Sequence, residues 1–242
     1  WRYLDAGNAT GDFQLLLPRE KGHRYSMTHR EGVFYLRTDR NALNFRIVKV
    51  AADDPREANW QDVVPHKDDV LVSSFEVFEK YAVVQERVLG LNRFRVLDFA
   101  DDSWREVTFP EAVYSAGGGG TPEYKSTTYR INYESMVTPP CVYDYDLKTL
   151  SRELKKQREV FDYDASQYVT ERVWAVARDG VKVPVSVVYK KGTPRDGTAP
   201  LWLYGYGSYG ITIQPTFSSE RLSLLDRGVI WATAHVRGSQ TL

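Results

Sequence analysis

The chain has 242 residues, 42% of them hydrophobic, and its 32 basic and 32 acidic side chains give a formal net charge of zero. This length can bury the core of one large domain or two ordinary ones, and the balanced charge favours neither nucleic acid nor an anionic membrane as a partner. No apolar stretch approaches the ~18 residues that span a bilayer, and the single cysteine, Cys141, excludes an intrachain disulfide. We therefore expect a cytoplasmic protein.

The first two-thirds of the chain, from Trp1 to about Val160, has the pattern of β structure. Short runs rich in Tyr, Phe, Val and Trp alternate with clusters of Asp, Asn, Gly and Pro, and helical periodicity is nearly absent. One pair of runs recurs about every 45 to 50 residues. Its copies are Trp1–Asp5 with Phe13–Pro18, Phe45–Val50 with Trp60–Pro65, Phe94–Phe99 with Trp104–Pro110, and Val142–Leu147 with Arg152–Leu154.

The repeat is typical of a β-propeller blade. Two further strand-like runs, such as Tyr25–His29 and Val33–Arg37, precede each later copy and complete a four-stranded unit. The sequence thus predicts three blades and the tail of a fourth. Because propellers close with about four to eight blades, we expect the chain to be a piece of a longer protein. Gly117–Gly120 is predicted to be a loop between strands, since no helix follows it to form a phosphate cradle.

The pattern changes after about residue 162. The predicted elements are a hairpin of Tyr168–Ala177 and Lys182–Tyr189, a buried strand at Ala199–Tyr204, a short helix at Phe217–Asp226 stopped by Gly228, and a buried strand at Val229–Val236. A strand, a crossover with a helix and a second strand are how a mostly parallel sheet begins. We expect two domains, with propeller blades at 1–162 and the start of an α/β domain at 163–242.

Several motifs carry a resemblance to a known family. They are Tyr204–Gly210, Arg221–Gly228, Ala234–Gly238, the hairpin segment Ala175–Ser186, and Glu20–Arg37 with Phe45. Together they closely resemble the prolyl oligopeptidase family of serine peptidases, and within it the oligopeptidase B branch. The resemblance extends over almost the whole chain.

The resemblance implies a seven-bladed propeller over an α/β-hydrolase domain, with a Ser-Asp-His triad between them. It implies hydrolysis of short peptides through an acyl-enzyme. By position, Tyr206 would be the tyrosine whose hydroxyl stabilises the oxyanion of the tetrahedral intermediate, beside a backbone N–H next to the nucleophile. A phenol held at a strand end by flanking glycines is a suitably rigid donor.

The triad itself is not expected in this chain. A hydrolase nucleophile lies in G-x-S-x-G, but Tyr206 stands two residues before Ser208, and Arg237 stands two residues before Ser239. We therefore expect the 242-residue chain to be inactive alone.

The four histidines are poor candidates for a catalytic base. His23, His29 and His66 lie in the predicted propeller, and His235 lies in a buried strand before any nucleophile. None is spaced with cysteine or carboxylate as metal ligands are, so neither a metal nor a cofactor is expected.

Two segments depart from the family. Ile211–Thr216 lacks the acidic residues that relatives carry there, and Ser239–Leu242 stands where relatives continue with further glycines.

The resemblance implies cleavage after Arg or Lys. Cleavage after Pro is the nearest alternative, and a propeller scaffold without catalysis is an alternative of a different class. The partners expected are short peptides; the oligomeric state stays open.

Overall fold

The computed structural model describes residues 1–8 and 10–238. In it β1 (Arg2–Tyr3) pairs with β2 (Gln14–Leu15), and three antiparallel sheets of four strands follow. The first contains β3 (Tyr25–Arg30), β4 (Val33–Thr38), β5 (Arg46–Ala51) and β6 (Gln61–Val64); the second β7 (Val70–Val77), β8 (Tyr81–Val88), β9 (Leu91–Asp98) and β10 (Ser103–Glu106); the third β11 (Tyr114–Gly118), β12 (Thr128–Ser135), β13 (Cys141–Asp146) and β14 (Arg152–Gln157). Short 3₁₀ turns lie at Glu57–Asn59 and Ala165–Gln167.

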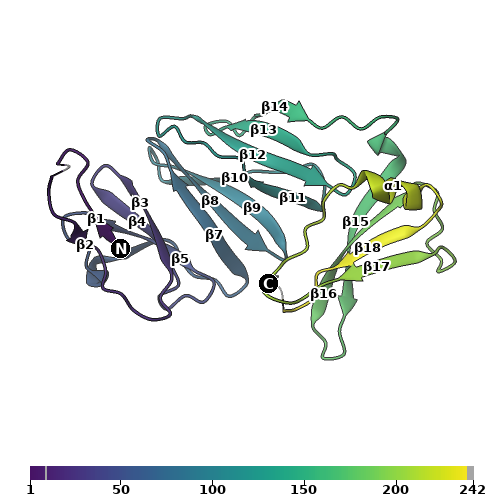
Figure 1. The fold of residues 1–242 in the computed structure, drawn as a ribbon, viewed down its shortest axis with the longest axis horizontal. Helices are drawn as coiled ribbons and strands as arrows, with labels where there is room; N and C mark the ends of the chain where they lie inside the picture. Colours follow the sequence, from purple (N-terminus) through teal and green to yellow (C-terminus); the bar gives the residue numbers. More distant parts are fainter. Residues whose placement is uncertain (9, 239–242) are drawn as a thin grey trace.

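Each of these sheets is a blade, because its strands follow one another in space in the order of the sequence. The blades fan out side by side (Figure 1) and, over the described residues, do not close into a ring. The repeat predicted from the sequence is confirmed: its four copies are β1 with β2, β5 with β6, β9 with β10 and β13 with β14. The β-propeller prediction is correct for this part of the chain.

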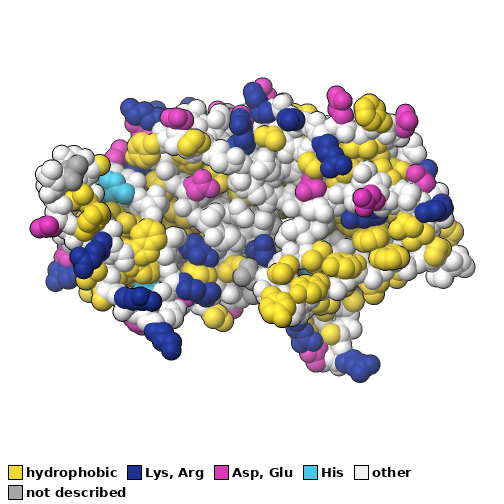
Figure 2. Space-filling model, viewed as in Figure 1, with side chains coloured by type: hydrophobic (Ala, Val, Ile, Leu, Met, Phe, Trp, Pro, Cys, Tyr) yellow, Lys and Arg dark blue, Asp and Glu magenta, His cyan; other side chains and the backbone are white. Residues whose placement is uncertain are grey.

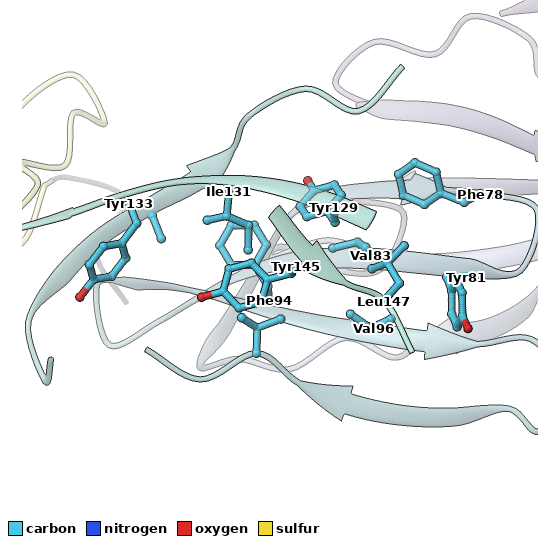
Figure 3. Close-up of a cluster of buried hydrophobic side chains, with 12 residues drawn as sticks. Phe78, Tyr81, Val83, Phe94, Val96, Tyr129, Ile131, Tyr133, Tyr145 and Leu147 are labelled. Carbon is cyan, nitrogen blue, oxygen red and sulfur yellow. The ribbon is translucent and has the colours of Figure 1, made fainter. Parts of the chain in front are cut away.

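The core lies between blades. On β12, Tyr129, Ile131 and Tyr133 alternate with exposed residues, so one face of the third blade is buried. These side chains meet Phe94 and Val96 of β9, and Figure 3 shows the cluster between the two sheets. A second cluster joins the first and second blades; it contains Phe45, Ile47, Val64, Val72 and Val84. Burial of these aromatic and branched side chains is what holds the blades in their relative positions.

The loop predicted at Gly117–Gly120 is partly wrong, because Gly117 and Gly118 belong to β11. A Cβ atom on Gly118 would lie 2.6 Å from the hydroxyl oxygen of Tyr129, and one on Gly119 would lie 2.5 Å from Cγ of Arg130. The glycines therefore leave room for side chains of the paired strand β12. A strand can tolerate glycine where another group approaches the backbone closely.

The last sheet differs from the blades. It contains β15 (Tyr168–Val176), β16 (Lys182–Lys190), β17 (Leu201–Gly205) and β18 (Ile230–Ala234), in the spatial order β15-β16-β18-β17. β17 and β18 are parallel and are joined through α1 (Ser219–Leu225), whereas the other two pairs are antiparallel. The hairpin, both strands and the helix were predicted correctly. Ser218 caps α1 by accepting a hydrogen bond from the Arg221 N–H, and Gly228 follows the helix with φ +81°.

The predicted burial of the strand at Ala199–Tyr204 is wrong. All five residues of β17 are exposed, Leu203 by 62%. β17 is an edge strand with β18 as its single paired neighbour among the described residues, and the exposure of its side chains shows that no described element buries its faces. Figure 2 shows hydrophobic side chains gathered on the surface of this sheet.

The last sheet docks on the third blade. Leu225 of α1, Val188 of β16 and Tyr168 of β15 pack with Val113, Met136 and Val137 of the blade in one cluster. Nearby, the Phe217 N–H donates to Oε2 of Glu134 at 2.9 Å. The two parts therefore share a core. Of the helices that the structure describes, none is long and apolar enough to cross a membrane.

Candidate functional site

Tyr206 lies directly after β17, where the parallel strands β17 and β18 end. Gly205 is in register with Ala234, so both strands leave the sheet at the same edge. Tyr206 is half-buried, and its hydroxyl makes no hydrogen bond to any residue in 1–8 or 10–238. The carboxyl end of parallel strands is where open α/β sheets bind ligands. A phenol with an uncommitted hydroxyl at this edge can donate a hydrogen bond to a ligand oxygen.

The backbone beside Tyr206 is packed against the chain that leaves β18. A Cβ atom on Gly207 would lie 2.2 Å from the carbonyl oxygen of Arg237 and 2.7 Å from Cγ2 of Val236. Gly238, with φ +92°, touches Gly207 in turn. This contact requires glycine at both positions, because a side chain on either would overlap backbone atoms. It fixes the position of the residue that precedes Gly207, which is Tyr206.

His235 lies one residue after β18 and is buried, with 4% of its surface exposed. Its Nε2 lies 2.7 Å from Oγ of the buried Ser186 on β16. Burial, and then the positive charge of Arg172, lower the pKa of His235 to about 4, against a smaller opposite effect of the Ile213 backbone. The imidazole is therefore neutral at physiological pH and serves as a hydrogen-bonding partner inside the sheet.

The propeller reaches this edge through the hairpin between β8 and β9. The carbonyl of Leu89 in that hairpin accepts a hydrogen bond from Arg172, and Nη1 of Arg87 donates to Oγ1 of Thr212 at 3.0 Å. Thr212 follows Tyr206 by six residues. The loop that carries Tyr206 is thus linked to the propeller by the hydrogen bond of Thr212, and β15 is linked to the same hairpin by that of Arg172.

A cavity of about 360 Å³ lies between this hairpin and the last sheet. Leu89, Trp174 and Pro184 give it apolar walls, and His235 and Arg237 also line it. Arg237 forms an ion pair with Asp179, with 2.5 Å between Nη1 and Oδ2. The cavity adjoins the Gly207 contact through Arg237. A larger cavity, of about 860 Å³, spans one face of the third blade and has no wall from the last sheet.

The structure also places the other sequence candidates, and among those it describes only Ser208 lies in the loop of Tyr206. Ser208 is exposed, and Ser239 is outside the described residues, as is the unusual segment Ser239–Leu242. His23 lies just before the first blade, at 2.7 Å from the Thr38 hydroxyl, His29 lies in β3, and His66 lies just after the blade. Within the described part of the chain, no three His, Cys, Asp or Glu side chains come together as a metal site would require. The absence of a triad from this chain stays a prediction.

The sequence did not predict the hydrogen-bonding partner of His235. The Ser186 hydroxyl that it contacts is 49 residues away in sequence, and the pairing follows from the register of β16 against β18. No local pattern encodes that register. A buried polar residue at the end of an apolar strand was the available signal, because such a residue needs a hydrogen-bonding partner.

Known proteins resemble this chain over nearly all of its length. Residues 1–158 match the family described as the N-terminal β-propeller domain of prolyl oligopeptidase. A dipeptidyl aminopeptidase BI from Pseudoxanthomonas mexicana is 45% identical over 96% of this chain and 32% of its own length. A protease 2 from Moraxella lacunata is 31% identical over 99% of this chain and 34% of its own.

The fold is similar to that of oligopeptidase B from Trypanosoma brucei, solved in a closed form with covalently bound antipain. That structure superposes with a TM-score of 0.88 at 33% identity, over 99% of this chain and 36% of the trypanosomal one. The chain thus spans about a third of the length of these relatives.

Proposed function

Because this chain belongs to the prolyl oligopeptidase family, we propose that it is part of a longer serine peptidase that hydrolyses short peptides. In such a reaction a serine activated by a histidine attacks the peptide carbonyl, the amine leaves, and water hydrolyses the acyl-enzyme. The relatives are peptidases by name, and this chain covers about a third of each. Within this reaction, we assign to the chain only the roles that its described residues can perform.

The proposed division of the chain is into blades at 1–162 and the first part of an α/β-hydrolase domain at 163–242. The parallel pair β17 and β18, joined through α1, supports this division because parallel pairs with helical crossovers build α/β sheets. The exposed edge strand β17 also fits, since a further strand of a longer chain could pair with it.

The residue that we propose to act in catalysis is Tyr206, as a donor to the oxyanion of the tetrahedral intermediate. The observation that carries this proposal is the uncommitted hydroxyl at the carboxyl edge, held by the contact of Gly207 with Arg237. A donor fixed before the reaction costs no reorganisation when the charge develops. Loss of one such donor costs about 2.7–4 kcal/mol of transition-state stabilisation.

The test is Tyr206→Phe in the full-length protein. We expect kcat on a peptide substrate to fall by about 10²–10³ with a small change in KM, because the lost interaction belongs to the transition state. Tyr209→Phe is the matched control, since Tyr209 lies in the same loop and is 91% exposed. An unchanged kcat in Tyr206→Phe would remove the assignment.

For specificity we propose cleavage after Arg or Lys, supported by the sequence resemblance to oligopeptidase B and by the high TM-score of its structure. The 45% identical dipeptidyl aminopeptidase favours a second candidate, removal of dipeptides from peptide N-termini. Reporter peptides with Arg, Lys or Pro before the scissile bond, each with a free or a blocked N-terminus, separate these two activities from each other and from cleavage after Pro. A propeller scaffold without catalysis would bind the peptides without turnover.

A further inference from the structure

A third cavity lies far from Tyr206 in the sequence. It has a volume of about 390 Å³ and is lined by Arg24, Arg37, Asn44, Phe45 and Ser73, among others. These residues come from the start of β3, the end of β4, the loop that follows it and the start of β7. The cavity therefore lies between the first and second blades.

The topology places this cavity on the propeller face that meets the last sheet. In each blade, the connection between the second and third strands lies at the same end: residues 39–45, 89–90 and 136–140. The second of these contacts Arg172 of the last sheet, and the third packs against Tyr168 and Leu225 through Val137. The first, which carries Asn44 and Phe45, belongs to the same face.

Arg37 is a half-buried cation that forms no ion pair with any described carboxylate. Its Nε donates to the Val72 carbonyl at 2.7 Å, and its guanidinium lies 3.4 Å from the centroid of the Phe45 ring. Its two Nη groups make no hydrogen bond, and no carboxylate lies within ion-pair distance, among residues 1–8 and 10–238. Burial, and then the charge of Arg24, lower the pKa of Arg37 to about 10 against a smaller opposite effect of Asp39, so the side chain stays protonated at neutral pH.

Arg24 supplies a second guanidinium at the same ring. Its Cζ lies 4.9 Å from the Phe45 centroid, and its Nε lies 2.7 Å from Oδ2 of Asp39. Two cations therefore share one carboxylate, which leaves one net positive charge. Phe45 adopts φ +63°, a conformation that costs energy for a bulky residue and that places its ring beside both arginines.

We infer that this cavity binds a carboxylate of a peptide substrate, through the free Nη groups of Arg37 and with Arg24 beside it. Guanidinium and carboxylate match in geometry and charge, and the partly desolvated position of Arg37 strengthens such a pair. The inference rests on the proposed peptidase function, because the substrate is what brings a carboxylate to this face. The carboxylate comes either from the peptide C-terminus or from an Asp or Glu side chain.

The experiment compares peptide pairs in the full-length enzyme. One pair has the same sequence with a free or an amidated C-terminus, and another has Glu or Gln at a single position on the leaving side; both are made in a series of lengths. For at least one length, we expect kcat/KM to be about tenfold higher for the carboxylate than for its neutral partner, the size of one charged hydrogen bond. The first pair tests whether the cavity binds the C-terminal carboxylate of the peptide, and the second tests whether it binds a carboxylate side chain.

The variants test whether the cavity is responsible. In Arg37→Gln the ratio of kcat/KM between charged and neutral peptides should fall toward one, and Arg24→Gln should lower it by a smaller factor. Arg56→Gln is the matched control, because Arg56 lies at the opposite end of the same blade and is 77% exposed; it should keep the ratio. The ratio is internal to each variant, so a partly destabilised protein still gives a result. If Arg37→Gln does not fold, the ratio of kcat/KM in Arg24→Gln tests the inference.

Three outcomes are distinguishable. A wild-type enzyme that hydrolyses no peptide in the series contradicts the proposed function itself. Hydrolysis with equal kcat/KM for charged and neutral peptides at every length overturns the inference and leaves the peptidase standing. A preference for the carboxylate that persists in both arginine variants places the anion site elsewhere, which also overturns the inference.

Discussion

Gly207 and Gly238 are in backbone contact where the chain leaves β17 and β18: a Cβ atom on Gly238 would lie 2.0 Å from the carbonyl oxygen of Gly207. The contact joins the loop after β17 to the loop after β18, although the two are 31 positions apart in the sequence (238 − 207). Tyr206 precedes one of these glycines, so the direction of its side chain depends on the contact.

Gly207→Ala should therefore damage activity more than stability. Its Cβ atom would lie 2.2 Å from the Arg237 carbonyl oxygen, and the backbone must move to relieve the overlap. We expect a loss of about 1–3 kcal/mol in the free energy of unfolding and, because an error of about 1 Å in a catalytic group can cost 10²-fold, a drop of that order in kcat. Urea unfolding and steady-state kinetics of the full-length protein measure the two effects.

Gly205→Ala is the control for that substitution. The nearest atom to its added Cβ would be the Ala234 carbonyl oxygen at 3.6 Å, an ordinary contact. Gly205→Ala should keep kcat within about twofold, since it requires no backbone shift. Equal losses in the two variants would mean that the contact does not position Tyr206.

The sequence contained enough information for the elements but not for the contacts between them. Alternating apolar residues and the recurring strand pair predicted the blades, and glycines after an apolar run placed Tyr206 at a strand end. Three contacts depend instead on strand register and on how the sheets dock. They are the hydrogen bond between His235 and Ser186, the backbone contact of Gly207 with Gly238, and the packing of Arg37 over the Phe45 ring. Side-chain periodicity specifies which face of a strand is apolar, and it carries no information on which distant strand lies opposite.

Glu86 on β8 is a buried carboxylate between two arginines of β9. It is 1% exposed, and its oxygens lie 2.6 Å from Nη2 of Arg93 and 2.5 Å from Nη2 of Arg95. Glu86→Gln should lower the free energy of unfolding by about 3–5 kcal/mol, because it leaves partly buried cations without a counter-charge. Glu153→Gln, on the exposed strand β14, removes a surface ion pair with Lys155 and should cost less than about 1 kcal/mol. Thermal unfolding of both variants gives the comparison.

The same carboxylate predicts an acid limit to stability. Burial alone would raise the pKa of Glu86, but the hydrogen bonds and charges of Arg95 and Arg93 outweigh it and hold the pKa below its ordinary value of 4.5. A carboxyl group whose pKa is lowered by folding stabilises the protein at pH values above its ordinary pKa. This stabilisation is lost as the pH falls below that ordinary pKa. The difference in melting temperature between wild type and Glu86→Gln should thus shrink below about pH 4.5. A difference in melting temperature that grew on acidification would mean that folding raises the pKa of Glu86 instead of lowering it.

His235 predicts a loss of stability in a higher pH window. Its pKa is about 4 in the folded protein and 6.5 for the free side chain. Above pH 6.5 the imidazole is neutral in both states; between pH 6.5 and 4 the unfolded state takes up a proton that the folded state does not, which favours unfolding by up to about 3 kcal/mol. His235→Gln should remove this pH dependence. Ser186→Ala should lower stability by about 1 kcal/mol at neutral pH and keep the dependence, because the buried histidine remains.

The core between the second and third blades should carry much of the stability of the propeller. Ile131 is fully buried in the middle of β12, and its side chain meets those of β9 across the gap between the sheets. Ile131→Ala would leave a cavity that stiff neighbouring strands can fill only in part, so we expect a loss of about 2–5 kcal/mol in the free energy of unfolding. Leu154 on the solvent face of β14 is 47% exposed, and Leu154→Ala should cost less than about 1 kcal/mol. Urea unfolding followed by tryptophan fluorescence measures both; similar losses would mean that the blades are not held together by this cluster.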